Sequence, residues 1–564
     1  MPKKIPRKVK EKTAPSSSRW DSDVRLLAWL ATCVSVFSFL FYFQRSEVLL
    51  YGDAVAHINI ARRVFDSKTP GLLQLGTVWL PLPHLLMIPF LISDEMWRRG
   101  VGGSIPSMVA YVLGVIGMFR LVRGAVSRAV EPDAAARVAA WIAAFVYAAN
   151  PNLIYLQTTA MGEAIYLALF VWVVVYFSEW MRGDVKALTK CGWCLAAACL
   201  TRYDGWFLAA AITAAVVWFS VRSGTQDAGA PRWPRAALAK FVLIAAAAPL
   251  LWLAYNGIVY RNPLEFANGP YSAKAIERRS QNSGSPGHPG SGNPALAGMY
   301  FLKSAEDNLA ENAWLQRTWV LLAVVGVVVA STLKVDVTLP GESSPRPWAP
   351  LLLLLVPLPF YALSVAYGGV PMFIPQWWPF SHYNVRYGLQ LLPAFAAAMG
   401  IIVHQVIRAQ QWNLRLRVVC VLGVCTFVIA SYASIWRDTP VSLKEAQVNM
   451  RTRSQLEAQV AIWLRKLPSD STLLMYLGDH VGALQQAGIP LKRVINEGNH
   501  RVWKQPTDPD GLWERALADP TRYADYVVAF EGDSVWQAVQ PRHLQALVEI
   551  HVTGQARAIL YRAR

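Results

Sequence analysis

An acid and a histidine stand one helical turn apart, directly after the first membrane-length apolar run of this sequence. Asp53 and His57 belong to Tyr51-Gly-Asp-Ala-Val-Ala-His-Ile-Asn-Ile-Ala-Arg-Arg63, which follows the apolar stretch 26–43. In a helix this spacing puts both side chains on one face. A charge beside hydrocarbon is costly, and a positioned carboxylate can take the proton of an attacking hydroxyl. Asp53 is therefore a candidate general base; the alternative is an N-cap for the helix that follows.

The composition places these residues in an α-helical polytopic membrane protein. Of the 564 residues, 54% are hydrophobic and 16% are charged, whereas soluble domains carry about 25% charged residues. The mean hydropathy is +0.28. The net charge of +18 does not indicate nucleic acid as a partner, because the basic residues cluster in short loops between apolar spans, as the positive-inside rule predicts. Membrane lipids are the partners that this pattern implies.

The apolar runs predict about eleven transmembrane helices. They cover residues 26–43, 105–123, 135–149, 163–181, 190–202, 206–221, 240–256, 317–333, 349–366, 387–407 and 417–435. The apolar segment 79–92 contains three prolines, and we interpret it as a juxtamembrane helix that does not span. Whether this segment spans decides on which side of the membrane all later loops lie. If it does not span, about a dozen basic residues fall in the cytoplasm, as the positive-inside rule predicts. The outer-face loops 44–104 and 257–316 then carry most of the polar candidates.

The two ends of the chain are predicted to lie on opposite sides of the membrane. Residues 1–25 are rich in Lys and Arg and precede an apolar run without a cleavage site, which indicates a disordered cytoplasmic tail. Residues 26–436 form the expected transmembrane domain. The pattern of residues 437–564 predicts a small α/β domain on the outer face. We expect the membrane to be a bacterial inner (plasma) membrane and this domain to be periplasmic or extracellular. Its strand-like runs are 472–477, 526–530 and 547–552.

Four stretches, together with Asp53 and Arg62-Arg63, resemble the GT-C class of polytopic glycosyltransferases. This class includes lipid and protein glycosyl- and mannosyltransferases that depend on polyprenyl-phosphate sugars. The stretches are Thr159-Ala-Met-Gly-Glu163-Ala, Leu200-Thr-Arg-Tyr-Asp-Gly-Trp206, Asn262-Pro-Leu-Glu-Phe-Ala-Asn-Gly-Pro-Tyr-Ser272 and His382-Tyr-Asn-Val-Arg386-Tyr-Gly-Leu-Gln-Leu-Leu-Pro393. Each motif alone is weak, but their order and common side of the membrane make the set fairly specific. The resemblance covers roughly residues 25–435.

The resemblance implies a membrane hexosyl- or pentosyltransferase. A sugar would move from a polyprenyl-phosphate donor to an acceptor hydroxyl or amine on the outer face, with inversion. Asp53 would be the general base, and Glu163 a second catalytic acid that orients acceptor or metal. Arg386 and Arg202 would bind the donor phosphate, because the planar guanidinium binds phosphate bidentately and meets the charge that develops as the sugar leaves.

Five further residues are expected to contact the acceptor or a divalent metal: His57, His84, Asp204, His382 and Tyr383. Structural roles stay open for several of the candidates. Glu163 and Asp204 can cap helices, and Arg386 can form a salt bridge with either of them. The stretch Gly76–His84 departs from several lipid-donor members, because His84 is its one titratable residue, whereas those members carry Lys-Pro-Pro or an acidic pair in this region.

Two other function classes compete with a glycosyltransferase. A transporter or flippase for lipid-linked sugars would need polar residues on both membrane sides or internal repeats, and the sequence shows neither. A ligase or polymerase of lipid-linked glycans would be expected to have a large Arg-rich outer loop, whereas the long outer loop here is rich in Gly and Ser. The acceptor in the leading interpretation is a lipid, a glycan or a protein.

Overall fold

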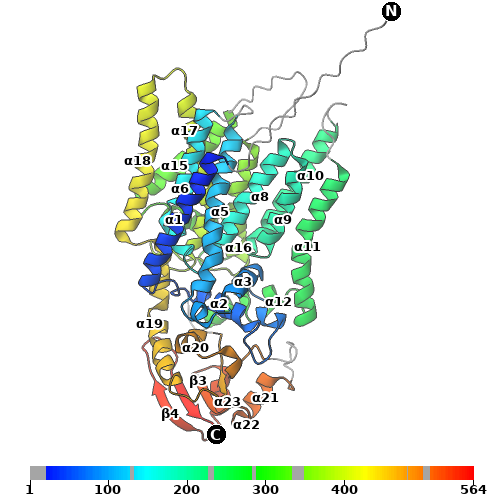
Figure 1. The fold of residues 1–564 in the computed structure, drawn as a ribbon, viewed down its shortest axis with the longest axis vertical. Helices are drawn as coiled ribbons and strands as arrows, with labels where there is room; N and C mark the ends of the chain where they lie inside the picture. The colour runs from blue at the N-terminus through cyan, green and yellow to red at the C-terminus, as the bar shows by residue number, and fades with distance from the viewer. Residues whose placement is uncertain are drawn as a thin grey trace, which may run out of the picture.

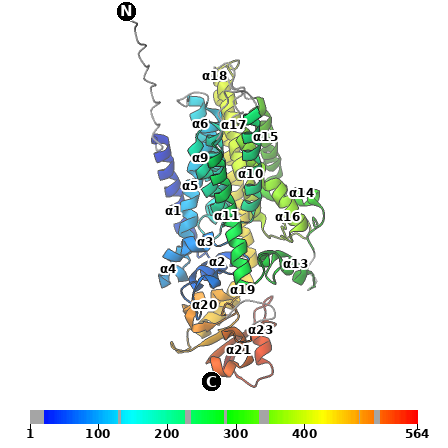
Figure 2. The ribbon, with the colours of Figure 1, turned by 90° about the vertical axis from the view of Figure 1, so that its right-hand side faces the viewer.

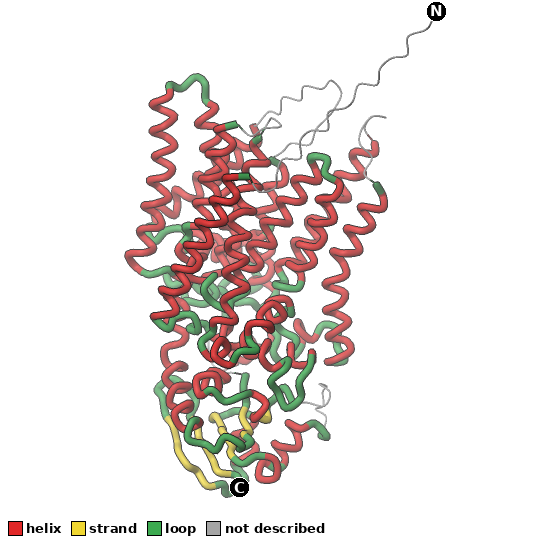
Figure 3. Tube along the Cα trace, in the orientation of Figure 1, coloured by secondary structure: helices red, strands yellow, loops and turns green. Residues whose placement is uncertain are grey.

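The computed structural model describes residues 21–127, 133–225, 234–282, 287–332, 348–478, 480–499 and 509–564. The helices form an elongated bundle, and the strands gather at one end of it (Figures 1 and 3). The predicted N-terminal tail, residues 1–25, lies outside the described residues except for 21–25, which open the first helix.

Nine segments among the described residues are helical, long and apolar enough to cross a membrane. They contain α1 (Ser22–Gln44), α5 (Val101–Val126), α8 (Glu163–Met181), α10 (Asp204–Thr225), α11 (Arg235–Val259), α15 (Ala313–Thr332), η3 and α16 (Ala349–Leu355, Pro357–Tyr367), η4 and α17 (Val385–Leu391, Leu392–Arg408), and α18 (Leu414–Asp438). Two shorter helices, α6 (Ala134–Ala148) and α9 (Val185–Cys199), pack in the same bundle against α17 and α8. These eleven helical segments overlap the eleven predicted ones, nine of them are long and apolar enough to cross a membrane among the described residues, and the protein is a multi-pass membrane protein.

Short helices cover the end of the bundle that faces the strands, among them α2, α3 and α12 (Figures 1 and 2). The segment 79–92 becomes two short pieces, because its prolines lack the N–H that a continuous helix needs. The short helices are α2 (Gly52–Arg63), η1 (Leu72–Leu75), α3 (Leu82–Met87), η2 (Ile88–Phe90), α4 (Asp94–Arg98), α7 (Pro151–Leu156), α12 (Glu265–Asn268), α13 (Ala273–Asn282) and α14 (Pro294–Asp307). In α2, buried Ala54, Val55, Ile58 and Ala61 follow the helical period and fix the helix on the bundle.

The C-terminal strands form one five-stranded sheet of order β2-β1-β3-β5-β4. β1 pairs in parallel with β2 and β3, while β5 runs antiparallel to β3 and β4. The strands are β1 (Leu473–Met475), β2 (Val494–Ile495), β3 (Tyr526–Phe530), β4 (Gln545–Ile550) and β5 (Ala558–Arg562). The helices of this region are α20 (Val481–Ala487), η5 (Leu491–Arg493), α21 (Leu512–Ala518), α22 (Pro520–Tyr523) and α23 (Ser534–Val539). The mixed helix and sheet content is the predicted one.

One helix, α19 (Val441–Leu464), connects the bundle to the sheet. Its beginning is fixed to the bundle, where the amide oxygen of Asn152 accepts a hydrogen bond from Ser442 N at 2.9 Å. Its end packs on the sheet, where Val460 and Leu464 meet Val528 and Ile550 around one small cavity. Because α19 touches both parts, the sheet holds a defined position relative to the bundle end.

η4 and α14 approach each other so closely that position 388 has no room for a side chain. A Cβ on Gly388 would lie less than 3.0 Å from backbone atoms of Ser304 and Ala305. Backbone cannot move aside as a flexible side chain can, and overpacking of this kind typically costs about 1–3 kcal/mol. Gly388 is therefore required for the position of η4.

We predict that Gly388→Ala lowers the free energy of unfolding by about 1–3 kcal/mol, because η4 and α14 must separate. The matched control is Gly423→Ala in α18, where a Cβ meets no atom within 4 Å; alanine there should be neutral or stabilise by about 0.5–1 kcal/mol. Thermal unfolding of both purified variants in detergent measures the difference. Equal melting temperatures for the two variants would contradict the close approach.

Candidate active site

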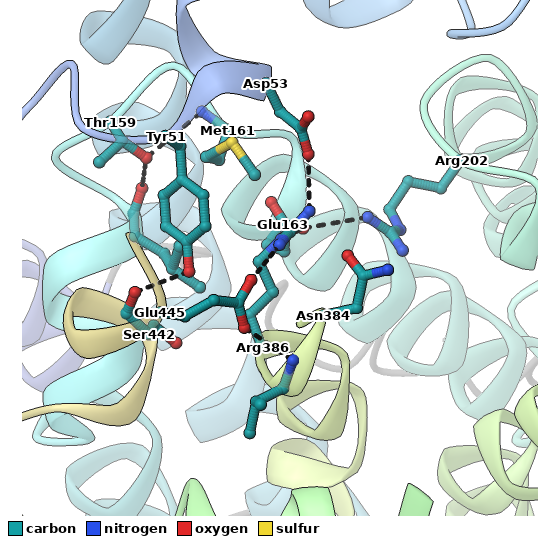
Figure 4. Close-up of polar contacts among 12 residues, drawn as sticks. Tyr51, Asp53, Thr159, Met161, Glu163, Arg202, Asn384, Arg386, Ser442 and Glu445 are labelled. Atoms are coloured by element: carbon teal, nitrogen blue, oxygen red, sulfur yellow. Dashed lines mark hydrogen bonds and ion pairs between the residues drawn. The ribbon is translucent and has the colours of Figure 1, made fainter. Parts of the chain in front are cut away.

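The guanidinium of Arg386 lies at the centre of a charged cluster (Figure 4) and is buried. Its Nη2 is 2.7 Å from Asp53 Oδ2, its Nε is 3.1 Å from Glu163 Oε1, and its Nη1 bonds Glu445 Oε1. The three carboxylates come from α2, α8 and α19. The ring of Tyr51 packs against the guanidinium, with its centroid 4.9 Å away. One buried arginine thus joins three elements that are far apart in the sequence.

Arg202 forms the second half of the same network. Its Nη1 is 3.2 Å from Glu163 Oε1, its Nε is 3.3 Å from Asp204 Oδ2, and its Nη2 donates to the Tyr361 hydroxyl at 3.0 Å. That hydroxyl donates in turn to Asp204 Oδ2 at 2.6 Å. Glu163 Oε1 therefore bridges the two arginines, and Asp204 pairs with Arg202 rather than with Arg386.

The local backbone conformation orients these side chains toward the cluster. Glu163 and Asp204 each occupy the first turn of a helix, where the helix dipole favours a carboxylate. Arg386 follows Asn384, which has a φ of +58°, a left-handed conformation that asparagine tolerates better than most residues. This turn starts η4 and directs Arg386 into the cluster.

Glu445 also belongs to the cluster, although no sequence motif predicted it as a site residue. Its side chain is 1% exposed, and its Oε2 accepts a hydrogen bond from the backbone N of Val385 at 2.7 Å. The carboxylate thus holds both the start of η4 and the guanidinium of Arg386. In sequence, Glu445 lies among the polar residues of a helix of soluble character, and only the contact of α19 with η4 distinguishes it from an ordinary surface residue.

Asp53 is the accessible carboxylate of the cluster. Its side chain is 42% exposed, against 1% for Glu163 and for Glu445. Only Oδ2 is bonded, and no hydrogen bond joins Oδ1 to any residue in the described part of the chain. Asp53 is thus the one carboxylate of the cluster that a molecule from solvent can reach without displacing a buried side chain.

The predicted histidines of the first loop form a pair beside the cluster. His57 Nδ1 lies 2.8 Å from His84 Nε2, and the His57 ring packs on Trp79. Burial lowers the pKa of both histidines, and the carboxylate of Asp53 opposes this for His57 only in part. Both rings are therefore neutral at pH 7, and one donates its N–H to the other.

The other two residues expected to contact the acceptor or a metal, Tyr383 and His382, lie in different surroundings. Burial and the negative charge of Asp53 raise the pKa of Tyr383 to about 12, so its hydroxyl stays protonated at the edge of the cluster. His382 lies away from the cluster, and burial together with Lys444 lowers its pKa. Within the described ranges, no three His, Cys, Asp or Glu residues are arranged to hold a metal ion.

Comparison with solved structures identifies the fold. Two crystal structures of ArnT from Cupriavidus metallidurans superpose on this chain, one bound to undecaprenyl phosphate and one in the apo state. The first has a TM-score of 0.55 with 14% identity over 96% of this chain and 98% of that chain. The second has a TM-score of 0.54 with 14% identity over 94% of this chain and 98% of that chain. The crystal structure of the Archaeoglobus fulgidus oligosaccharyltransferase, tethered with an acceptor peptide, has a TM-score of 0.47 with 12% identity over 95% of this chain and 74% of that chain.

No family model matches the sequence. No curated protein sequence matches it either. The likeness in three dimensions spans nearly the whole chain, both bundle and sheet-bearing end. The chain therefore has the fold of the ArnT structures, and the GT-C fold that the motif resemblance implies is confirmed.

We predict that Glu445→Ala lowers the free energy of unfolding by about 3 kcal/mol, because it removes one partner of a buried ion pair and leaves the backbone N–H of Val385 without its acceptor. The control on the same helix is Lys444→Ala, whose ion pair with Asp438 is well exposed and should contribute about 0–1 kcal/mol. Chemical or thermal unfolding in detergent compares them. A Glu445 variant as stable as the Lys444 variant would show that the cluster does not depend on α19.

Proposed function

We propose that this protein is a glycosyltransferase that moves a sugar from a polyprenyl-phosphate donor to a hydroxyl or amine of an acceptor, with inversion at the anomeric carbon. The observation that carries the proposal is the contact of Asp53 with Arg386, an accessible carboxylate held against a buried guanidinium. Inverting transfer needs a base for the acceptor and a cation for the phosphate that leaves. The solved structure of ArnT with undecaprenyl phosphate supports a lipid-phosphate partner for this fold.

Asp53 would act through its unbonded oxygen. The acceptor oxygen attacks the anomeric carbon and forms the new glycosidic bond while its proton passes to Asp53 Oδ1. The bond between the sugar and the phosphate oxygen breaks, and its electron pair stays on the phosphate.

Arg386 would bind the donor phosphate by exchanging one partner. Its guanidinium has five N–H donors, and Glu163 and Glu445 hold it from buried positions. Asp53 is the exposed partner, so an incoming phosphate displaces Asp53 rather than the other two. The exchange places positive charge where the phosphate gains negative charge and releases Asp53 to the acceptor. Donor binding would thus prepare the base.

Glu163 and Arg202 would support the exchange. Glu163 Oε1 bridges the two arginines, so it fixes their separation, while Arg202 adds a second positive charge beside the phosphate. Asp204 and Tyr361 hold Arg202 from the opposite side. His57, His84 and Tyr383 would contribute hydrogen bonds at the acceptor side of Asp53.

The same proposal includes an orientation in the membrane. The C-terminal ends of α5 and α8 lie at the end of the bundle opposite the sheet (Figure 1). Arg123 is in the last turn of α5, and Arg182 is the C-cap of α8. Under the positive-inside rule that end faces the cytoplasm. The cluster and residues 437–564 then lie on the outer face, which is the periplasmic side in a bacterial inner membrane.

We expect Asp53→Asn to reduce the rate of transfer by about 10²–10⁴-fold, because the amide cannot take the acceptor proton. The control is Asp94→Asn in the same loop, whose side chain is 70% exposed and contacts Arg62 instead of the cluster; it should keep the wild-type rate. The assay follows label from a polyprenyl-phosphate sugar into an envelope extract that supplies the acceptor. Wild-type turnover by the Asp53 variant would remove Asp53 from the role of base.

A further inference from the structure

The carboxyl ends of the parallel strands face the first loop of the bundle. In the strand order β2-β1-β3, β1 lies between the other two strands. The chain runs from β1 to β2 on one side of β1 and then crosses to β3 on its other side. Open α/β sheets bind ligands at such a reversal, outside the carboxyl ends of the strands. Here that edge meets the loop after α2, since Gln74 Nε2 donates to Gly498 O at 2.8 Å and Asn499 Nδ2 donates to Ser67 Oγ at 3.1 Å.

Arg63, the last residue of α2, reaches this edge and forms no hydrogen bond with any residue that the structure describes. Its side chain is 15% exposed, and its Nε is buried without a partner. Its one ion pair among the described residues is a 3.7 Å approach of Nη1 to Glu497 Oε1, which is longer than a hydrogen bond. The neighbouring Arg62 differs, because Asp66 and Asp94 both pair with it. A guanidinium buried without hydrogen bonds destabilises the fold.

Gln74 supplies an unused acceptor beside the unused donors. Its side chain is buried, Nε2 is bonded, and Oε1 has no partner in the described structure. A Cβ built on Gly498 would lie 2.7 Å from Gln74 Oε1 and 3.4 Å from Arg63 Nη1. The amide oxygen and the guanidinium therefore face the same small region, next to a backbone that carries no side chain.

We propose that Arg63, Gln74 and the loop Asn496–Asn499 form a subsite for the hydroxyl groups of a neutral sugar unit of the acceptor. A hydroxyl can accept from Arg63 and donate to Gln74 at once, whereas an anion would be repelled by the carboxylate of Glu497. Arg63 lies ten positions after Asp53 in α2, a rise of about 15 Å along the helix. This subsite rests on the proposed transferase function, and it makes the acceptor a glycan longer than one sugar.

Two properties of Arg63→Met test the subsite. The melting temperature of the full-length protein should stay the same or rise, because an unpaired buried charge is replaced by an apolar chain of similar length. Binding of the purified protein to an array of neutral and anionic glycans should show retention of neutral oligosaccharides by the wild type. Arg63→Met and Gln74→Leu should each weaken that binding roughly tenfold. The matched control is Arg62→Met, which should lower the melting temperature.

Several outcomes would overturn the subsite. A fall in melting temperature for Arg63→Met as large as for Arg62→Met would make Arg63 a structural link to Glu497. Retention of anionic glycans alone, of no glycan, or of neutral glycans equally by wild type and both variants would remove the sugar-binding role. The array needs no donor, so a protein that binds neutral glycans but transfers nothing from polyprenyl-phosphate sugars would contradict the proposed function and leave the subsite standing.

Discussion

The structure of the bundle end depends on the burial of one guanidinium. Removing an arginine from water is unfavourable unless opposite charges and hydrogen bonds compensate for it, and Arg386 meets this condition only where α2, α8 and α19 converge. Each carboxylate is held by its own element, so none of the three elements can shift without leaving charge unpaired. The close approach of η4 to α14 at Gly388 fixes the arginine from the other side.

This arrangement links the C-terminal region to the cluster. Glu445 is near the beginning of α19, and the end of the same helix packs on the sheet. A change at the sheet, such as ligand binding at its carboxyl edge, would act on a helix that carries a partner of Arg386. The sheet-bearing region is therefore more than an appended domain, since a residue of α19 takes part in the charge balance of the candidate active site.

Much of this could be predicted from the sequence, for identifiable reasons. The apolar runs predict the spans because membrane thickness fixes their length, and charged residues at span ends predict Glu163 and Arg386 because such residues need partners. Neither signal exists for Glu445, which lies among other polar residues of a helix. The strand β2 has two residues, too few for an alternating pattern, and β5 is not among the predicted runs.

The pairing within the cluster also lay beyond the sequence. The motifs allow Arg386 to pair with Glu163 or Asp204, and the structure gives it Glu163, Asp53 and Glu445, with Asp204 on Arg202. Such choices depend on how helices rotate and pack, which spacing along the chain does not encode. His57 and His84 are a similar case, because two segments of the first loop must fold together before the rings meet.

A structure of the full-length protein with polyprenyl phosphate, determined by electron cryomicroscopy, would test the exchange of partners at Arg386 most directly. The phosphate is expected within hydrogen-bonding distance of Arg386, with Glu163 and Glu445 still paired to it and with Asp53 released from its 2.7 Å contact. A phosphate bound elsewhere, with the contact of Asp53 and Arg386 intact, would contradict the proposal that this cluster receives the donor.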